Sequence, residues 1–109
     1  MTTLPEKSCG IERLITHPKL VAAAIAGNKT EQRRHGVYGW PGETFVLEDI
    51  KFVITDLQRQ SLGDMTDTHA KAEGYDDLAS YQNIILKMHA GMIWNDEGLA
   101  WVHSFVRQL

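Results

Sequence analysis

One stretch decides the fold: Gly27-Asn28-Lys29-Thr30-Glu31-Gln32-Arg33-Arg34, where a helix ends and a strand begins. Upstream of it, Pro18 suits the first turn of a helix, and apolar residues follow at helical spacing from Leu20 to Ile25. Gly27 can cap the end of that helix, because glycine tolerates a left-handed conformation. The pattern predicts a short helix over residues 18–26 and an extended segment over residues 30–37.

Strands on both sides of this stretch are predicted from runs of β-branched and aromatic residues. Two runs that follow a Gly/Pro-rich loop are separated only by a short turn around Glu48 to Ile50, so we expect an antiparallel hairpin. A short strand near the start and a last strand that returns to the sheet complete the set. The predicted strands outside the opening stretch are 11–15, 43–48, 51–59 and 100–107.

Two further helices are predicted in the second half of the chain. Asp64 or Thr66 can cap the first, which runs to about Glu73 and can end at Gly74. Asp76 can cap the second. The apolar residues of the second helix share one face: Leu78, Tyr81, Ile85 and Met88.

The element order α, β, β, β, α, α, β is typical of an α+β fold, with a small curved sheet or barrel and helices at its side. The 109 residues suit one domain, 1–109, in which residues 1–10 form a loose N-terminal segment. The longest apolar run, Leu20 to Ala26, is too short to span a bilayer, so no membrane partner is expected. Cys9 is the single cysteine, which excludes an internal disulfide, and these features together predict a cytoplasmic protein.

The basic residues are concentrated in one place, although the net charge of −3 gives no general attraction to nucleic acid. Lys29, Arg33 and Arg34 form a cluster that suits a small anionic ligand or a short nucleic-acid segment. Alternatively, the two arginines are solvated or pair with Glu31. Because side chains alternate along a strand, Gln32 and Arg34 are expected on one face and Glu31 and Arg33 on the other.

Two other groups of residues carry chemistry. His69 and Glu73 lie four residues apart on a predicted helix, so they could bind a metal, act as an acid–base pair or simply hydrogen-bond to each other. The five histidines show no paired metal spacing, so no metal and no cofactor is expected. Tyr38 and Trp40 lie in the Gly/Pro-rich loop, where an aromatic ring beside arginines can stack on a base. The other two tryptophans are expected in the core: Trp94 and Trp101.

In their order and spacing, the motifs of this chain resemble those of ASCH domains, which are small β-barrels of the PUA-like superfamily associated with RNA and modified nucleosides. Gly27-Asn28-Lys29-Thr30 resembles the G-x-K signature of that family, and the likeness covers roughly residues 15–107. It implies a mixed PUA-like barrel of about five strands flanked by three helices. The other matching segments are Leu62-Gly63-Asp64-Met65-Thr66, His69-Ala70, Ala72-Glu73-Gly74-Tyr75, the helix 76–86 and Trp101-Val102-His103-Ser104-Phe105.

Some bacterial ASCH-like proteins are amidohydrolases that remove the acyl group from N-acylated cytidine. The resemblance implies a lysine at the G-x-K position, a threonine three residues later and a glutamate in the A-x-E segment. These positions fall on Lys29, Gln32 and Glu73, so the place of the nucleophile holds an amide, which is not nucleophilic. Thr30 could substitute, although strand neighbours point to opposite faces. Arg34 matches the arginine that follows the threonine position in the family.

Three functions remain open on this basis. The first is an ASCH-type module that binds RNA or a modified nucleotide in a cleft between the segment Gly27–Arg34 and the Glu73 loop. The second is an amidohydrolase with Lys29 as base and Glu73 as acid. Both require Lys29 and Glu73 to lie close together, whereas in the third, an interaction protein, the cleft serves only packing. The expected ligand-binding residues are Gly27, Gln32, Arg33, Arg34, Tyr38, Trp40 and Tyr75.

Overall fold

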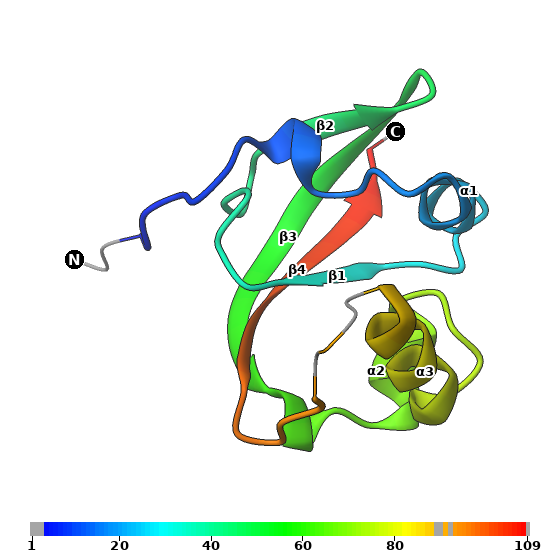
Figure 1. The fold of residues 1–109 in the computed structure, drawn as a ribbon. Helices are drawn as coiled ribbons and strands as arrows, with labels where there is room; N and C mark the ends of the chain where they lie inside the picture. The colour runs from blue at the N-terminus through cyan, green and yellow to red at the C-terminus, as the bar shows by residue number, and fades with distance from the viewer. Residues whose placement is uncertain (1–3, 89–90, 92, 109) are drawn as a thin grey trace.

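A curled antiparallel sheet forms the centre of the computed structural model, which describes residues 4–88, 91 and 93–108 (Figure 1). The strand order is β1-β4-β3-β2. Among the described residues, four strands and three helices confirm an α+β fold with a half-barrel sheet. The strands are β1 (Glu31–Arg34), β2 (Thr44–Leu47), β3 (Ile50–Ser61) and β4 (Leu99–Arg107). The helices are α1 (Pro18–Ile25), α2 (Asp67–Ala72) and α3 (Leu78–Met88), with two 3-10 turns, η1 (Ile11–Arg13) and η2 (Leu62–Asp64).

The strands β2 and β3 form the predicted hairpin, in which Leu47 lies opposite Ile50. The turn consists of Glu48 and Asp49, whose φ angles are 49° and 71°. A two-residue turn with both φ angles positive matches the right-handed twist of the strands that it joins. The hairpin is therefore tight, although neither turn residue is glycine.

The strands β3 and β4 are the longest, and their pairing curls the sheet. They pair from Phe52 opposite Arg107 to Ser61 opposite Leu99, with a shift of register between Ile54 and Asp56. Such an irregularity bends a strand and increases its twist. The curl leaves β1 at one edge of the sheet, between α1 and the pair formed by α2 and α3 (Figure 1).

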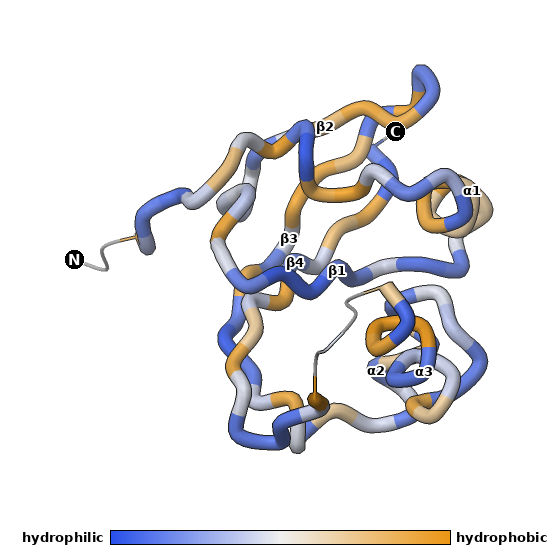
Figure 2. Tube along the Cα trace, in the orientation of Figure 1, coloured by the Kyte–Doolittle hydropathy of each residue, from blue (hydrophilic) through white to orange (hydrophobic). Residues whose placement is uncertain are grey.

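Two separate apolar clusters hold the elements together. The first packs α1 and η1 against the sheet, and contains three phenylalanine rings with centroids 5.5–5.8 Å apart. The second joins α2 and α3 through Met65, Ala70 and Tyr81. Figure 2 shows that β1, unlike the other strands, is hydrophilic along its length. This polar strand therefore lies between the two cores and has no apolar residues of its own to bury.

Two strand predictions near the start of the chain are wrong. Residues 11–15 do not form a strand, because Ile11–Arg13 is a 3-10 turn, and the sheet consequently has four described strands rather than about five. The carbonyls of Arg13 and Leu14 accept hydrogen bonds from the side chain of Arg34 instead of from a neighbouring strand. The strand expected over 30–37 is only four residues long, since the chain turns away from β4 after Arg34.

The helix predictions hold: α1 begins at Pro18 as predicted, and only the start of α3 is shifted, by one residue. Of the two candidate caps for α2, Thr66 is the one used, because its hydroxyl accepts the N–H of His69. The cap of α3 is Asp77, whose Oδ1 accepts the N–H of Ser80 at 2.8 Å, and not Asp76. Within the part of the chain that the structure describes, no helix has the length and apolar content needed to cross a membrane.

Two aromatic side chains make contacts that the sequence did not predict. Trp40 packs against the N-terminal segment: its indole N–H donates to the carbonyl of Pro5 at 2.8 Å, and Lys7 lies over its ring while pairing with Glu43. These contacts attach residues 5–7, which were expected to be loose, to the Gly/Pro-rich loop. Trp101 is half-buried rather than in either core, and it stacks under the guanidinium of Arg59.

The hairpin turn generates a testable expectation. Replacing Glu48 by Asn and Asp49 by Gly (E48N/D49G) supplies the residues that tolerate positive φ best. We expect the double variant to raise the free energy of unfolding by roughly 1 kcal/mol, measured by urea denaturation. An unchanged or lower stability would show that the turn is not strained by its present residues.

Candidate functional site

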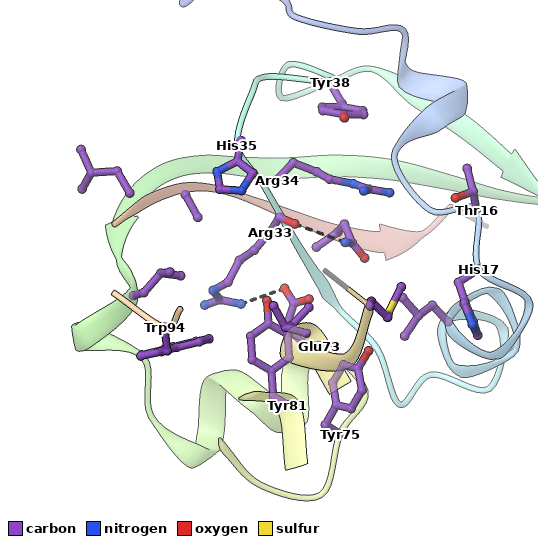
Figure 3. Close-up of a pocket in the computed structure, with 17 residues that line it drawn as sticks. Thr16, His17, Arg33, Arg34, His35, Tyr38, Glu73, Tyr75, Tyr81 and Trp94 are labelled. Atoms are coloured by element: carbon purple, nitrogen blue, oxygen red, sulfur yellow. Dashed lines mark hydrogen bonds and ion pairs between the residues drawn. The ribbon is translucent and has the colours of Figure 1, made fainter. Parts of the chain in front are cut away.

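A cavity of about 220 Å³ lies between β1, the start of α1 and the helices α2 and α3 (Figure 3). Its polar lining includes Gln32, Arg33, Arg34 and Glu73, together with Thr16, His17 and His35. Ligand sites are typically concave, mostly apolar and furnished with a few polar groups that fix orientation. The cavity has this character, and its size suits a small molecule or a single unit of a polymer.

Two helix ends bring the predicted lysine and glutamate together. Gly27, with φ 84°, ends α1, and the chain then enters β1 with Lys29 pointing inward. Gly74, with φ 102°, ends α2 directly after Glu73. The N–H of Thr30 donates to the carbonyl of Ala72 at 2.7 Å, which ties the two ends to each other. Both glycines occupy left-handed positions that other residues rarely adopt.

Lys29 is held behind Glu73 by three acceptors. Its Nζ donates to the carbonyls of Glu31 at 2.7 Å and Glu73 at 2.8 Å, and to the Glu73 carboxylate at 3.4 Å. Lys29 and Glu73 are only 1% and 2% exposed. Burial lowers the pKa of Lys29, while the Glu73 carboxylate opposes that effect. The ammonium can donate only three hydrogen bonds, so all its donors are occupied within the protein.

Arg33 occupies the other side of the same carboxylate. Its Nη1 donates to Glu73 Oε2 and to Glu31 Oε1, both at 2.9 Å, and its Nε donates to Gln60 Oε1 at 2.9 Å. The sequence left open that one of the arginines pairs with Glu31, and Arg33 does so. Two cations and two carboxylates balance in this buried cluster, which limits the cost of removing the charges from water.

Two buried polar atoms in the cavity lining have no hydrogen-bond partner among the described residues. They are Oε1 of Gln32, an acceptor, and Nη2 of Arg33, a donor. The other polar atoms of both side chains are engaged, because the Gln32 amide N–H donates to the Arg33 carbonyl at 3.3 Å. Buried polar atoms are almost always paired, and leaving one unpaired costs roughly 1–3 kcal/mol. A ligand that reached both atoms would need one donor and one acceptor.

Aromatic side chains form the walls of the cavity. Tyr75, Tyr81 and Trp94 make edge-to-face contacts in series, with centroids 5.2 and 6.2 Å apart. Burial raises the pKa values of Tyr75 and Tyr81, and the charge of Glu73 adds to the effect, so both phenols stay neutral. Figure 3 shows Tyr81 directed at Glu73 and Trp94 beside Arg33. Neutral aromatic walls of this kind suit a flat, uncharged ring system.

Arg34 supports the remaining wall, Tyr38. Its Nε and Nη2 donate to the Leu14 carbonyl at 3.1 and 2.8 Å, and its guanidinium lies 5.2 Å from the centroid of the Tyr38 ring. Burial raises the pKa of the Tyr38 hydroxyl as well. Arg34, which was expected to bind a ligand, therefore uses two of its nitrogens for hydrogen bonds to the backbone and positions an aromatic ring.

The structure brings together most of the residues singled out from the sequence. Gln32, Arg33, Arg34, Tyr38, Glu73 and Tyr75 all line the cavity. Lys29 lies behind the lining and contacts Glu73, as two of the sequence hypotheses required. The predicted positions that do not line the cavity are Gly27, Thr30 and Trp40.

Other parts of the site were not foreseen. Tyr81 and Trp94 were assigned to packing, and they do pack, but they also line the cavity. Gln60 carried no signal, because its role depends on the pairing of β3 with β4. His69 does not pair with Glu73 but accepts the backbone N–H of Thr66 at 3.0 Å. Among the described residues, no group of three His, Cys, Asp or Glu side chains is placed to hold a metal ion.

Two solved structures share this fold. The high-resolution crystal structure of an ASCH domain from Lactobacillus crispatus JV V101 matches with a TM-score of 0.68 and 14% identity, over 81% of this chain and 69% of that chain. A crystal structure of a protein from Enterococcus faecalis V583 matches with a TM-score of 0.61 and 14% identity, over 83% and 67%. The sequence matches no protein-family model and no curated protein. The architecture implied by the sequence resemblance is therefore confirmed at the level of the fold.

The shared carboxylate generates a stability prediction. Glu73→Gln leaves Lys29 and Arg33 buried without their common counter-charge, so we expect the free energy of unfolding to fall by roughly 3–5 kcal/mol in a urea titration. The matched control is Asp76→Asn, three residues further along and exposed, which should change it by less than about 0.5 kcal/mol. Equal effects of the two substitutions would contradict the assignment of the cluster.

Proposed function

We propose that the protein binds a nucleoside or nucleotide, with one base inserted into the cavity. The observation that carries the proposal is the pair of unpartnered buried atoms, Gln32 Oε1 and Arg33 Nη2. Nucleobase edges offer hydrogen-bond donors and acceptors in one plane. A base can therefore satisfy both atoms, whereas an aliphatic ligand would leave them unpaired at a cost of roughly 1–3 kcal/mol each.

The aromatic lining of the cavity and the charges around Arg33 and Glu73 favour a base over a phosphate at this end of the cavity. Tyr38, Tyr75 and Trp94 offer ring faces and edges, and stacking on aromatic side chains contributes roughly 1–3 kcal/mol per base. The cations of Lys29 and Arg33 are already balanced by Glu73 and Glu31. An anion placed next to Arg33 would also meet the Glu73 carboxylate, whose charge opposes it.

The cavity accommodates one base more readily than a length of RNA. The residues that carry recognition gather around one partly open cavity of about 220 Å³, whereas a protein that binds single-stranded nucleic acid along its length uses an extended groove. A terminal or flipped-out base of an RNA remains compatible with the site. The likeness to an ASCH domain supports the proposal only through the fold.

The binding test uses Gln32, whose side-chain amide makes one hydrogen bond within the described protein. Gln32→Met keeps the length of the side chain and removes Oε1, which has no partner in the described protein. We expect affinity for the best-bound nucleoside among cytidine, N-acetylcytidine, uridine, adenosine and guanosine to fall about tenfold by calorimetry, the loss of one buried hydrogen bond. The matched control is Gln58→Met, an exposed glutamine outside the cavity, which should bind as the wild type does. Wild-type protein that binds none of the five at low salt would overturn the proposal.

Hydrolysis of N-acylated cytidine is the second candidate. One observation favours it: Lys29 and Glu73 are in contact, and burial lowers the pKa of Lys29. The surroundings of these residues favour binding without turnover. The amine is occupied by three acceptors, Gln32 stands where a nucleophile is needed, and Thr30 is exposed outside the cavity.

A product assay separates the two candidates. Protein incubated with N-acetylcytidine is expected to release no cytidine, followed by chromatography, although it binds the compound. Release that is abolished in Gln32→Met but kept in Gln58→Met would instead establish the amidohydrolase, with a water molecule as the attacking group.

A further inference from the structure

A buried histidine connects the two segments that flank the proposed binding site. His103, in the middle of β4, is 0% exposed. Its Nε2 accepts the backbone N–H of Tyr38 at 3.0 Å, and its Nδ1 lies 3.2 Å from the carbonyl of Gln32. Tyr38 and Gln32 both line the cavity, but they belong to different segments, the Gly/Pro-rich loop and β1. His103 itself does not line the cavity.

These two contacts define one form of the imidazole ring. A backbone N–H can only donate, so Nε2 must be the unprotonated nitrogen. The proton of the neutral ring is then on Nδ1, where it is donated to the Gln32 carbonyl. The rings of Tyr38 and His103 also meet edge to face, with centroids 6.1 Å apart. Only the neutral ring with its proton on Nδ1 satisfies all three contacts.

We infer that His103 is a positioning residue for the proposed site: its neutral ring fixes Tyr38 against β1, and acid releases this wall of the cavity. A second proton on Nε2 removes the acceptor of the Tyr38 N–H, and a donor then faces a donor. The loop that carries Tyr38 loses its link to the sheet at that point. The inference rests on the proposed function, because the wall matters only if the cavity holds a ligand.

The groups around His103 oppose its protonation. The charge of Arg34, on β1, acts on the His103 ring. The neighbour from the loop is the neutral phenol of Tyr38. From β3, the residue paired with His103 is the apolar Leu57. Burial lowers the pKa of His103 and Arg34 lowers it further, while hydrogen bonds to the backbone of Gln32 and Trp101 act in the opposite direction. The neutral form is therefore the native one near pH 7.

The sign of the pH effect follows from this arrangement. Because the folded-state pKa lies below the ordinary value of about 6.5, the contribution of His103 is complete above that pH. It is lost as the pH falls through the folded-state pKa. If only the neutral form binds, affinity for N-acetylcytidine should decrease up to tenfold for each further pH unit.

Nuclear magnetic resonance of the ligand-free protein tests the inference without depending on any ligand. We expect the His103 ring to carry its proton on Nδ1 near pH 7. On acidification, the Tyr38 amide should shift and lose protection from hydrogen exchange, with the same midpoint as the His103 ring. A ring protonated on Nε2, or a Tyr38 amide that stays protected through the titration of His103, would overturn the inference.

Two variants test whether His103 causes the pH-dependent change at Tyr38. In His103→Gln, the amide can replace the hydrogen bonds but cannot titrate, so the pH-dependent step (the shift and the loss of protection of the Tyr38 amide) should disappear. In His17→Gln/His35→Gln, which removes the two histidines of the cavity lining, the step should persist with an unchanged midpoint. If His103→Gln does not fold, the wild-type titration decides alone. Absence of nucleoside binding at every pH, with the Tyr38 step intact, would refute the proposed function while leaving the positioning role established.

Discussion

The structure depends on one carboxylate shared by two buried cations. Glu73 accepts Lys29 on one oxygen and Arg33 on the other, and the three side chains come from the end of α2, the entrance to β1 and β1 itself. The contact joins the half of the molecule that contains α1 and the sheet to the half that contains α2 and α3. Each half has its own apolar core, and the polar strand between them is held by its backbone pairing with β4 and by these buried charges. Buried ion pairs tolerate little change, because the loss of one partner leaves the others uncompensated.

This arrangement also gives the cavity its chemical character. Because Glu73 and Glu31 balance Lys29 and Arg33 within the protein, the part of the lining formed by Arg33 and Glu73 carries little net charge. Position 32 is decisive for the proposed function, because the glutamine there can donate and accept hydrogen bonds but is not a nucleophile. Neighbouring side chains hold the lining residues in place: Gln60 orients Arg33, Arg34 orients Tyr38, and His103 joins Tyr38 to β1.

Local sequence patterns predicted the elements well and their contacts less well. The helix ends at Gly27 and Gly74 and the hairpin follow from backbone preferences that act over a few residues. The meeting of Lys29 with Glu73, 44 positions apart, came from the resemblance to a known domain and not from the pattern itself. Gln60 and His103 gave no local signal, since their roles arise from the register between strands. For the basic cluster the sequence left open a ligand-binding role or pairing with Glu31, and most of the donors of the cluster bind the protein's own backbone and carboxylates.

The hydrogen bonds along β1 have one more consequence, for self-association. The carbonyl of Thr30 points toward β4, so those of Glu31 and Arg33 point away from it, at the open edge of the sheet. Both of these carbonyls are already occupied, by Lys29 Nζ and by the Gln32 amide. An unpaired strand edge is normally a template on which a second chain can add. Here the side chains that build the pocket also cap that edge, so the sheet resists growth into aggregates from this side.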